Sequence, residues 1–196
     1  MIKRCYRYYG GLISAQEKWL NRMAKKGFRL KRVGKFLYEF EACLPGQYEY
    51  RVEWIGQKTP SDASNYRNFL EDCGYTTFYK NLNLNYSIGK VRYRPWADKG
   101  ARLSTNGTTF NRELLIVEKE CDGKPFELHT SYEDRMVYYA SLRKPWLFLF
   151  LLLFLIAVFF PSYLSVAFAI LPLFPIAIYQ AQIYRTKKKM ILKECK

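Results

Sequence analysis

A short basic and aromatic stretch, KVRYRPW, carries the residues best suited to recognition: Arg92, Tyr93, Arg94 and Trp96. Arginine, tyrosine and tryptophan are the side chains that most often anchor protein–protein interfaces. Basic residues alternating with aromatic ones also suit single-stranded nucleic acid, whose bases stack on the rings. We favour a protein partner and disfavour nucleic acid, because a predicted membrane anchor in the same chain offers the basic residues a nearer polyanion.

Residues of the kinds that catalyse reactions or bind metals form no recognisable set. The single histidine, His129, cannot build a His-based metal site, and no phosphate-binding glycine motif occurs. Four glutamates fall on neighbouring predicted strands: Glu39, Glu41, Glu49 and Glu53. With Arg51 among them, they are more simply cross-strand ion pairs than an acid–base site. We therefore expect a protein that is not an enzyme and uses no cofactor or metal.

The charge balance indicates a polyanionic surface as a partner. The chain has 196 residues and a formal net charge of +15, from 32 Lys and Arg against 17 Asp and Glu. Such a balance is typical of proteins that meet nucleic acid or the anionic inner leaflet of a membrane. Its 17 tyrosines and 14 phenylalanines exclude a disordered polyelectrolyte. The 5 cysteines are widely spaced, which is typical of free thiols in a reducing compartment.

The C-terminal third predicts a transmembrane helical hairpin over residues 145–184. No residue in this range is charged, and one span of the hydrocarbon core needs about 20 apolar residues. The range therefore fits two spans, about 146–160 and 163–184, joined at Pro161. The first span is only about 22 Å long, so either its helix continues back through residues 136–142 or the bilayer thins locally. Pro172 and Pro175 are expected to kink the second span.

Basic residues flank both ends of this hairpin, and its central turn has no charge. They are candidates to contact anionic lipid headgroups: Arg143, Lys144, Arg185, Lys187, Lys188 and Lys189. The positive-inside rule then predicts a multi-pass protein of the cell membrane with both termini in the cytoplasm. Since neither span contains an ionisable residue, we expect an anchor or a packing surface rather than a transport pathway.

Residues 1–130 predict a cytoplasmic α+β domain made of two β-α-β-β units in tandem. In the first unit, a strand over Lys3–Tyr9 leads to a helix that Ser14 caps and Gly27 ends. Two strands follow the helix: Phe28–Val33 and Lys35–Cys43. Both units together predict a ferredoxin-like sandwich, with the two helices covering one face of an antiparallel sheet.

The second unit repeats this order with a long insertion. After a strand over Tyr48–Ile55, Ser61 or Asp62 is expected to cap a helix that ends at Gly74. Apolar and charged residues alternate in Tyr48–Ile55, which predicts one covered face and one solvent-exposed face. Residues 81–112 predict a long hairpin or an exposed insertion. A connecting helix over 131–144 then leads to the membrane, and residues 185–196 form a basic cytoplasmic tail.

Three segments resemble a bacterial family known as domain of unknown function 2812: WLNRMAKKGFRL, YEFEACLPGQYEYRVEW and NFLEDCGY. Tyr75 stands where the family usually has tryptophan, and residues 81–112 replace its usual short hairpin. The resemblance implies a cytoplasmic domain often followed by membrane helices, and it supplies no catalytic residue. Genes of the family often neighbour regulators of the PadR type, which hints at envelope stress or drug response.

The sequence thus favours a membrane-anchored cytoplasmic interaction or regulatory module without enzymatic activity. Its expected partners are the membrane, anionic lipid headgroups, and either another protein or a second copy of the chain. The alternative is an accessory subunit of a membrane export or resistance transporter, which would pack through the kinked hairpin.

Overall fold

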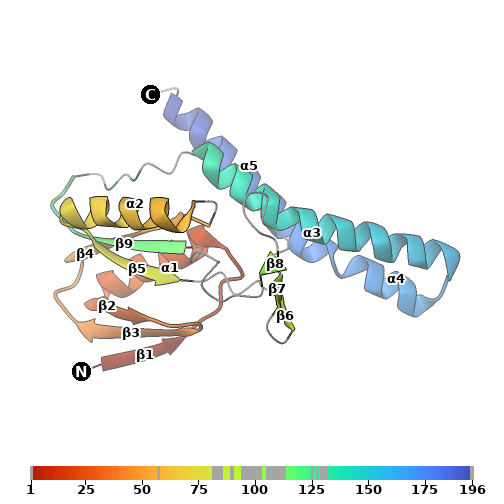
Figure 1. Cartoon of the computed structure of the whole chain (residues 1–196), viewed down its shortest axis with the longest axis horizontal. Coiled ribbons are helices and arrows are strands. Elements are labelled where there is room, and N and C mark those ends of the chain that lie inside the picture. Colours follow the sequence, from red (N-terminus) through yellow and green to blue (C-terminus); the bar gives the residue numbers. More distant parts are fainter. Residues whose placement is uncertain are drawn as a thin grey trace. The chain divides into compact units, whose positions relative to one another are not determined.

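The computed structural model describes residues 2–56, 58–80, 86–88, 91–93, 103–104, 114–124, 126, 128 and 132–194. The described residues divide into two compact units, an α+β domain within residues 2–128 and a helical hairpin over residues 132–194 (Figure 1). The structure therefore confirms a mixed α+β fold that is followed by a helix pair.

The first three-stranded sheet is built from the N-terminal elements β1 (Ile2–Tyr6), α1 (Ile13–Lys25), β2 (Phe28–Val33) and β3 (Leu37–Ala42). Its order is β1-β3-β2, and both pairings are antiparallel. The strand that comes last in sequence thus lies between the first two, and α1 connects two parallel strands that are not neighbours. This split β-α-β arrangement leaves β1 and β2 as the edges of the sheet.

The second sheet has the same order, built from β4 (Tyr48–Trp54), α2 (Pro60–Asp72), β5 (Thr76–Lys80) and β9 (Leu114–Glu120). Its order is β4-β9-β5, again antiparallel throughout. Between β5 and β9, the insertion contributes a small third sheet in the order β6-β7-β8, from β6 (Tyr86–Ile88), β7 (Val91–Tyr93) and β8 (Leu103–Ser104).

Helix α1 is amphipathic, and its buried positions follow helical spacing. Ile13, Leu20 and Met23 are buried, and the ring of Trp19 packs edge-on against Tyr38 and Phe40 of β3. The predicted cap at Ser14 is wrong, because the helix begins at Ile13 after Leu12 without a side-chain cap. The backbone hydrogen bond from Ile13 N to Gly11 O, at 2.9 Å, tightens the preceding turn instead.

Helix α2 begins earlier than the sequence predicted. Thr59, rather than Ser61 or Asp62, is its N-cap, and the Thr59 hydroxyl accepts a hydrogen bond from the backbone N–H of Asp62. Pro60 follows at the first helical position, where its fixed φ and missing N–H are tolerated. Both helices end before a glycine with positive φ, Gly27 or Gly74, as predicted.

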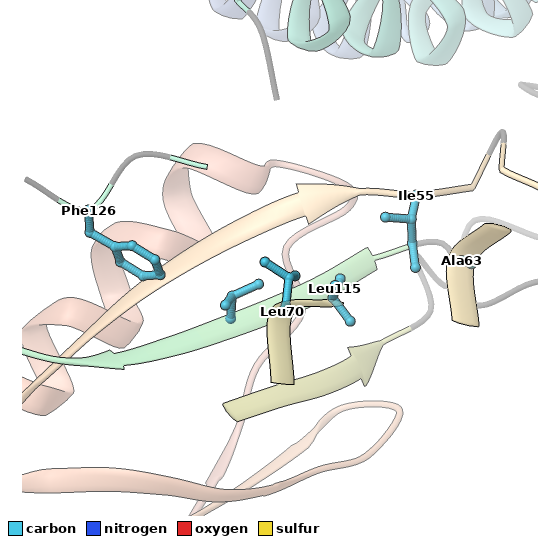
Figure 2. Close-up of a cluster of buried hydrophobic side chains, with 6 residues drawn as sticks. Ile55, Ala63, Leu70, Leu115 and Phe126 are labelled. Carbon is cyan, nitrogen blue, oxygen red and sulfur yellow. The ribbon is translucent and has the colours of Figure 1, made fainter. Parts of the chain in front are cut away.

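The central strand β9 is buried on both faces. Leu115 and Val117 pack against Ala63 and Leu70 of α2, with Phe126 at the same cluster (Figure 2). The intervening residues of β9 point to the opposite face and are buried as well: Leu114, Ile116 and Glu118. Because α2 covers the face that the sequence assigned to solvent, the predicted exposure of Glu53 is wrong, and only 2% of this residue is accessible.

The ferredoxin-like sandwich is not confirmed. The strands outside the insertion form two three-stranded sheets instead of one, and α1 and α2 have different strand contacts. Helix α2 covers the outer face of β4-β9-β5, whereas α1 contacts β2 and β4. The side chain of Lys80, at the end of β5, reaches the ring of Tyr38 in β3, so the two sheets are in contact.

The helical hairpin consists of α3 (Tyr132–Phe159), α4 (Tyr163–Ile170) and α5 (Leu173–Glu194). Helix α3 joins the predicted connecting helix and the first predicted span without interruption, and Pro145 lies inside it. The second predicted span is broken at Leu171 and Pro172, where a turn separates α4 from α5. Helix α3 lies alongside α4 and α5 (Figure 1).

The ends of α1 and α2 give a test of the backbone, because Gly27 and Gly74 share a conformation but differ in their surroundings. Both have positive φ, of 79° and 85°, but a Cβ on Gly27 would lie 2.9 Å from the carbonyl oxygen of Cys43, whereas one on Gly74 would meet nothing within 4 Å. We expect Gly27→Ala to lower the free energy of unfolding by about 1 kcal/mol or more beyond the loss in Gly74→Ala.

Urea denaturation of both variants of the full chain in detergent, followed by tryptophan fluorescence, measures this difference. Gly74→Ala serves as the control for the backbone conformation alone. Equal losses in the two variants would contradict the close approach of Gly27 to Cys43.

Candidate functional site

The hairpin carries the most distinctive surface in the described part of the chain. Residues 132–159 and 163–192 form two helical stretches that are long and apolar enough to cross a membrane. Only 6% and 17% of their most apolar windows are buried. Core helices of soluble proteins hide such residues, whereas here large side chains such as Phe148, Phe159 and Phe174 are at least 70% exposed. This exposure fits contact with lipid tails.

All six predicted headgroup contacts lie at one end of this apolar surface. Arg143 of α3 donates a hydrogen bond from Nη1 to Oε1 of Gln180 in α5, so these two positions are level across the helix pair. Lys144 adjoins Arg143, and the basic residues of α5 begin just beyond Gln180. Arg143 is half-buried, and the other five are exposed: Lys144, Arg185, Lys187, Lys188 and Lys189.

The opposite end of the hairpin is a closed turn without charge. The hydroxyl of Ser162 accepts a hydrogen bond from the backbone N–H of Ser165, and the hydroxyl of Ser165 accepts one from the N–H of Ser162. The hydroxyl of Ser165 also lies 2.9 Å from the carbonyl oxygen of Phe160. Satisfying these groups inside the turn lowers the cost of placing it in or near hydrocarbon.

The predicted partner-binding residues of the insertion are only partly described. Arg92 and Tyr93 belong to β7, where Arg92 is opposite Ser87 and Ser104, and Tyr93 is opposite Tyr86 and Leu103. Tyr93 is 41% exposed. Arg94 and Trp96 lie outside the described residues. The structure therefore places two of the four candidates on one strand and does not test the group as a whole.

A polar seam joins α1 to the edge of β4. The amide of Asn21 donates to the carbonyl of Tyr50 at 2.8 Å and accepts from its N–H at 2.9 Å. Glu17 accepts a hydrogen bond from the N–H of Val52 and pairs with Arg51 at 3.0 Å. These side chains occupy the hydrogen-bonding groups that another strand would otherwise use. Asn21, Tyr50 and Arg51 therefore have a structural role here.

A buried carboxylate lies behind this seam. Glu118 of β9 accepts a hydrogen bond from the Tyr50 hydroxyl at 2.6 Å and forms an ion pair with Arg29 at 2.9 Å. The Tyr50 oxygen also accepts from the N–H of Leu30 at 2.7 Å. Burial, with the neighbouring Glu118 carboxylate, raises the pKa of Tyr50. The phenol therefore stays neutral and acts as a donor to Glu118, which is no arrangement for general base catalysis.

Glu118 was not predicted as a buried residue, although the sequence contains a signal for it. This residue follows four apolar residues in LLIVEKE, and a glutamate in such a run is either at a strand end or buried with a partner. Two of the four glutamates on neighbouring strands form cross-strand ion pairs, Glu39 with Arg4 and Glu41 with Lys31, whereas Glu49 pairs with Arg51 of the same strand. Glu53 instead accepts a hydrogen bond from the hydroxyl of Tyr66 at 2.6 Å.

Lys80 is a further buried charged residue whose burial the sequence did not predict. Its ammonium donates to the carbonyl oxygens of Gly34 and Lys35, at 3.1 and 2.9 Å, and lies 4.7 Å from the ring centroid of Tyr38. Burial lowers the pKa of Lys80 to about 8. The contacts with two backbone carbonyls and a ring fix the end of β5 against the β2–β3 turn, so we assign Lys80 a structural role.

Comparison with known proteins identifies a family but no activity. A family model described as "Protein of unknown function (DUF2812)" matches residues 13–151, more than two thirds of the chain. No curated protein and no solved structure matches the chain. Among the described residues, no group of three or more His, Cys, Asp or Glu could hold a metal ion.

The lowered pKa of Lys80 predicts that the free energy of unfolding depends on pH. The folded state binds its proton less tightly than the unfolded chain, where a lysine has a pKa of about 10.4. Protonation therefore favours unfolding, and the contribution of Lys80 to the free energy of unfolding rises by up to about 3 kcal/mol between pH 8 and 10.4. We expect the wild type to gain stability relative to Lys80→Met over this range.

Urea denaturation of both proteins in detergent at a series of pH values measures the difference. The comparison with Lys80→Met cancels the titration of tyrosines and cysteines, which the two proteins share. Parallel stability curves from pH 7 to 10 would show that Lys80 keeps an ordinary pKa in the folded protein.

Proposed function

Since the chain belongs to the DUF2812 family of proteins of unknown function, we propose a function from its geometry: a membrane-anchored interaction module without enzymatic activity. In this proposal the hairpin inserts into the cell membrane, and the α+β domain meets a protein partner in the cytoplasm. One observation carries it, namely an exposed helix pair whose apolar part has no charge and whose basic residues gather at one end.

The distribution of charge supports an anchor that enters and leaves the membrane on the same side. Arg143 and Gln180 are level across the helix pair, and the basic residues of both helices lie at or beyond that level. Each Lys or Arg near an anionic leaflet contributes about 1 kcal/mol of attraction. Because cytoplasmic flanks carry the excess of Lys and Arg, we place both termini and the α+β domain in the cytoplasm.

An interaction role is favoured over catalysis by how the domain uses its polar groups. Glu17, Glu118 and Glu53 bind neighbouring backbone or side-chain groups, as does Lys80. These contacts stabilise the fold and leave no described pair of acid and base facing a common reactant. Exposed basic and aromatic residues, in contrast, are abundant on the domain, and arginine and tyrosine favour protein interfaces.

Two native cysteines give a test of this topology without altering the protein. Cys73 and Cys121 are exposed free thiols on the α+β domain. We expect the protein to resist extraction by alkaline carbonate, and a membrane-impermeant maleimide to label both thiols in inside-out vesicles but not in intact spheroplasts. Cys73→Ser and Cys121→Ser assign the labelled positions.

Release by carbonate would refute the integral hairpin. Labelling of Cys73 and Cys121 in intact spheroplasts would instead leave the hairpin in the membrane and refute the orientation.

The turn that separates α4 from α5 supports a second candidate function, that of an accessory subunit of an export or resistance transporter. Pro172 has no N–H, so the carbonyl of Phe168 loses its usual helical partner inside the apolar segment. In hydrocarbon such a carbonyl is stabilised by a donor from a neighbouring helix. Exchanging residues 145–184 for an unrelated charge-free hairpin separates the candidates: a transporter role is lost, whereas binding of a cytoplasmic partner is retained.

A further inference from the structure

The two main sheets of the domain have four edge strands, and three of them are covered. The outer edge of β4 is bound by Asn21 and Glu17 of α1. The outer edge of β2 gives its Leu30 N–H to the Tyr50 hydroxyl, and β2 and β5 lie against each other. The fourth edge strand, β1, pairs with β3 on one side, and no described strand pairs with its other side.

The alternation of hydrogen bonds between β1 and β3 shows which backbone groups of β1 point away from β3. The N–H of Arg7 donates to the carbonyl of Phe36 at 2.8 Å, which makes Arg7 and Phe36 a hydrogen-bonded pair. Bonded and non-bonded pairs alternate along antiparallel strands, so Cys5 also bonds to β3. The backbone N–H and C=O groups of Ile2, Arg4 and Tyr6 therefore point to the open edge. Four of the five residues of β1 are exposed, Tyr6 by 73%.

The charge of β1 indicates which kind of strand could pair with its open edge. The segment IKRCYRYY is basic, and no acidic residue precedes Glu17 in the sequence. In an antiparallel pair of two β1 strands centred on Arg4, the two Arg4 residues would be directly opposite, and like charges in that position are destabilising. The basic edge therefore discourages pairing with a second copy and favours an acidic strand. Glu39 already pairs with Arg4 at 2.9 Å from the neighbouring strand β3.

We propose that β1 binds an extended acidic segment of a partner protein as an additional strand of the β1-β3-β2 sheet. Backbone hydrogen bonds from Arg4 and Tyr6 hold the segment, and its carboxylates lie beside Arg4 on one face of the sheet or beside Lys3 and Arg7 on the other. This inference rests on the proposed function, because it names the class of partner that the cytoplasmic module takes.

A proline substitution tests strand addition without breaking the existing ladder. Tyr6→Pro removes an N–H that points outward and that β3 does not use, so β1 should stay paired with β3. Tyr6→Val is the matched control, since it removes the ring and keeps the N–H. The probe is a capped peptide of alternating valine and glutamate, mixed with the full chain in nanodiscs of neutral lipid.

We expect the peptide to slow amide exchange at Arg4 and Tyr6 in the wild type and in Tyr6→Val. Tyr6→Pro should bind it about tenfold more weakly, which corresponds to about 1.4 kcal/mol or one to two backbone hydrogen bonds. A peptide with equal charge but with prolines in place of valines should not protect these amides. Amide exchange of β3 in the free variants reports whether Tyr6→Pro keeps the sheet intact.

Equal binding of both peptides would show simple charge attraction and overturn the inference. Failure of the valine–glutamate peptide to protect Arg4 and Tyr6 in wild type would overturn it as well. If the β3 amides of Tyr6→Pro are no longer protected from exchange, the variant has lost the sheet. The comparison of the two peptides on the wild type then tests the inference by itself. Membrane insertion is measured on the same nanodiscs, so a chain that inserts but binds no acidic strand refutes this inference and leaves the anchor in place.

Discussion

The side-chain amide of Asn21 joins the two halves of the α+β domain. It binds both backbone groups of Tyr50, at 2.8 and 2.9 Å, and so takes the place of a strand at the edge of β4. Just beyond it, the end of α1 bonds to the loop that leads into β4: Gly46 donates to Ala24, and Cys43 donates to Gly27. These contacts connect two of the segments that resemble the family, WLNRMAKKGFRL and YEFEACLPGQYEYRVEW. The residues that carry the resemblance therefore meet in the folded domain.

The contacts of Asn21 with β4 also determine which sheet edges of the domain remain available for a partner. With the edge of β4 closed by α1 and the edge of β2 bonded to the Tyr50 hydroxyl, the open edge of the two main sheets is β1. The buried acids Glu53 and Glu118 are bound inside the domain, whereas most basic residues remain at the surface. Much of the net charge of +15 therefore lies on the described surface, where it suits the anionic lipid and acidic protein that we propose as partners.

Local signals in the sequence were sufficient for some features of the fold. Gly27 and Gly74 ended their helices as predicted, because a left-handed residue is a strong local requirement. The apolar helix pair was equally clear, since its length and lack of charge need no tertiary information. Glu39 and Glu41 form cross-strand ion pairs as predicted, whereas Glu49 pairs with Arg51 within its own strand.

Features that depend on contacts distant in sequence were not predicted. The exposure of Glu53 was wrong because alternation shows two faces of a strand but cannot show that α2 covers the second one. The separation into two sheets depends on α1 lying at the edge of β4, through Asn21 and Glu17. The buried ion pair of Glu118 and Arg29 joins residues 89 positions apart, beyond the reach of any local pattern.

Insertion of the hairpin is the central claim, and spin-label accessibility in lipid vesicles tests it most directly. Phe154 is exposed in the apolar part of α3, and Lys188 is exposed beyond the level of Gln180 in α5. We predict that a label at Phe154→Cys is relaxed by oxygen and shielded from a water-soluble nickel chelate, with the reverse at Lys188→Cys. Ready access of the nickel chelate to the label at position 154 would contradict the membrane anchor.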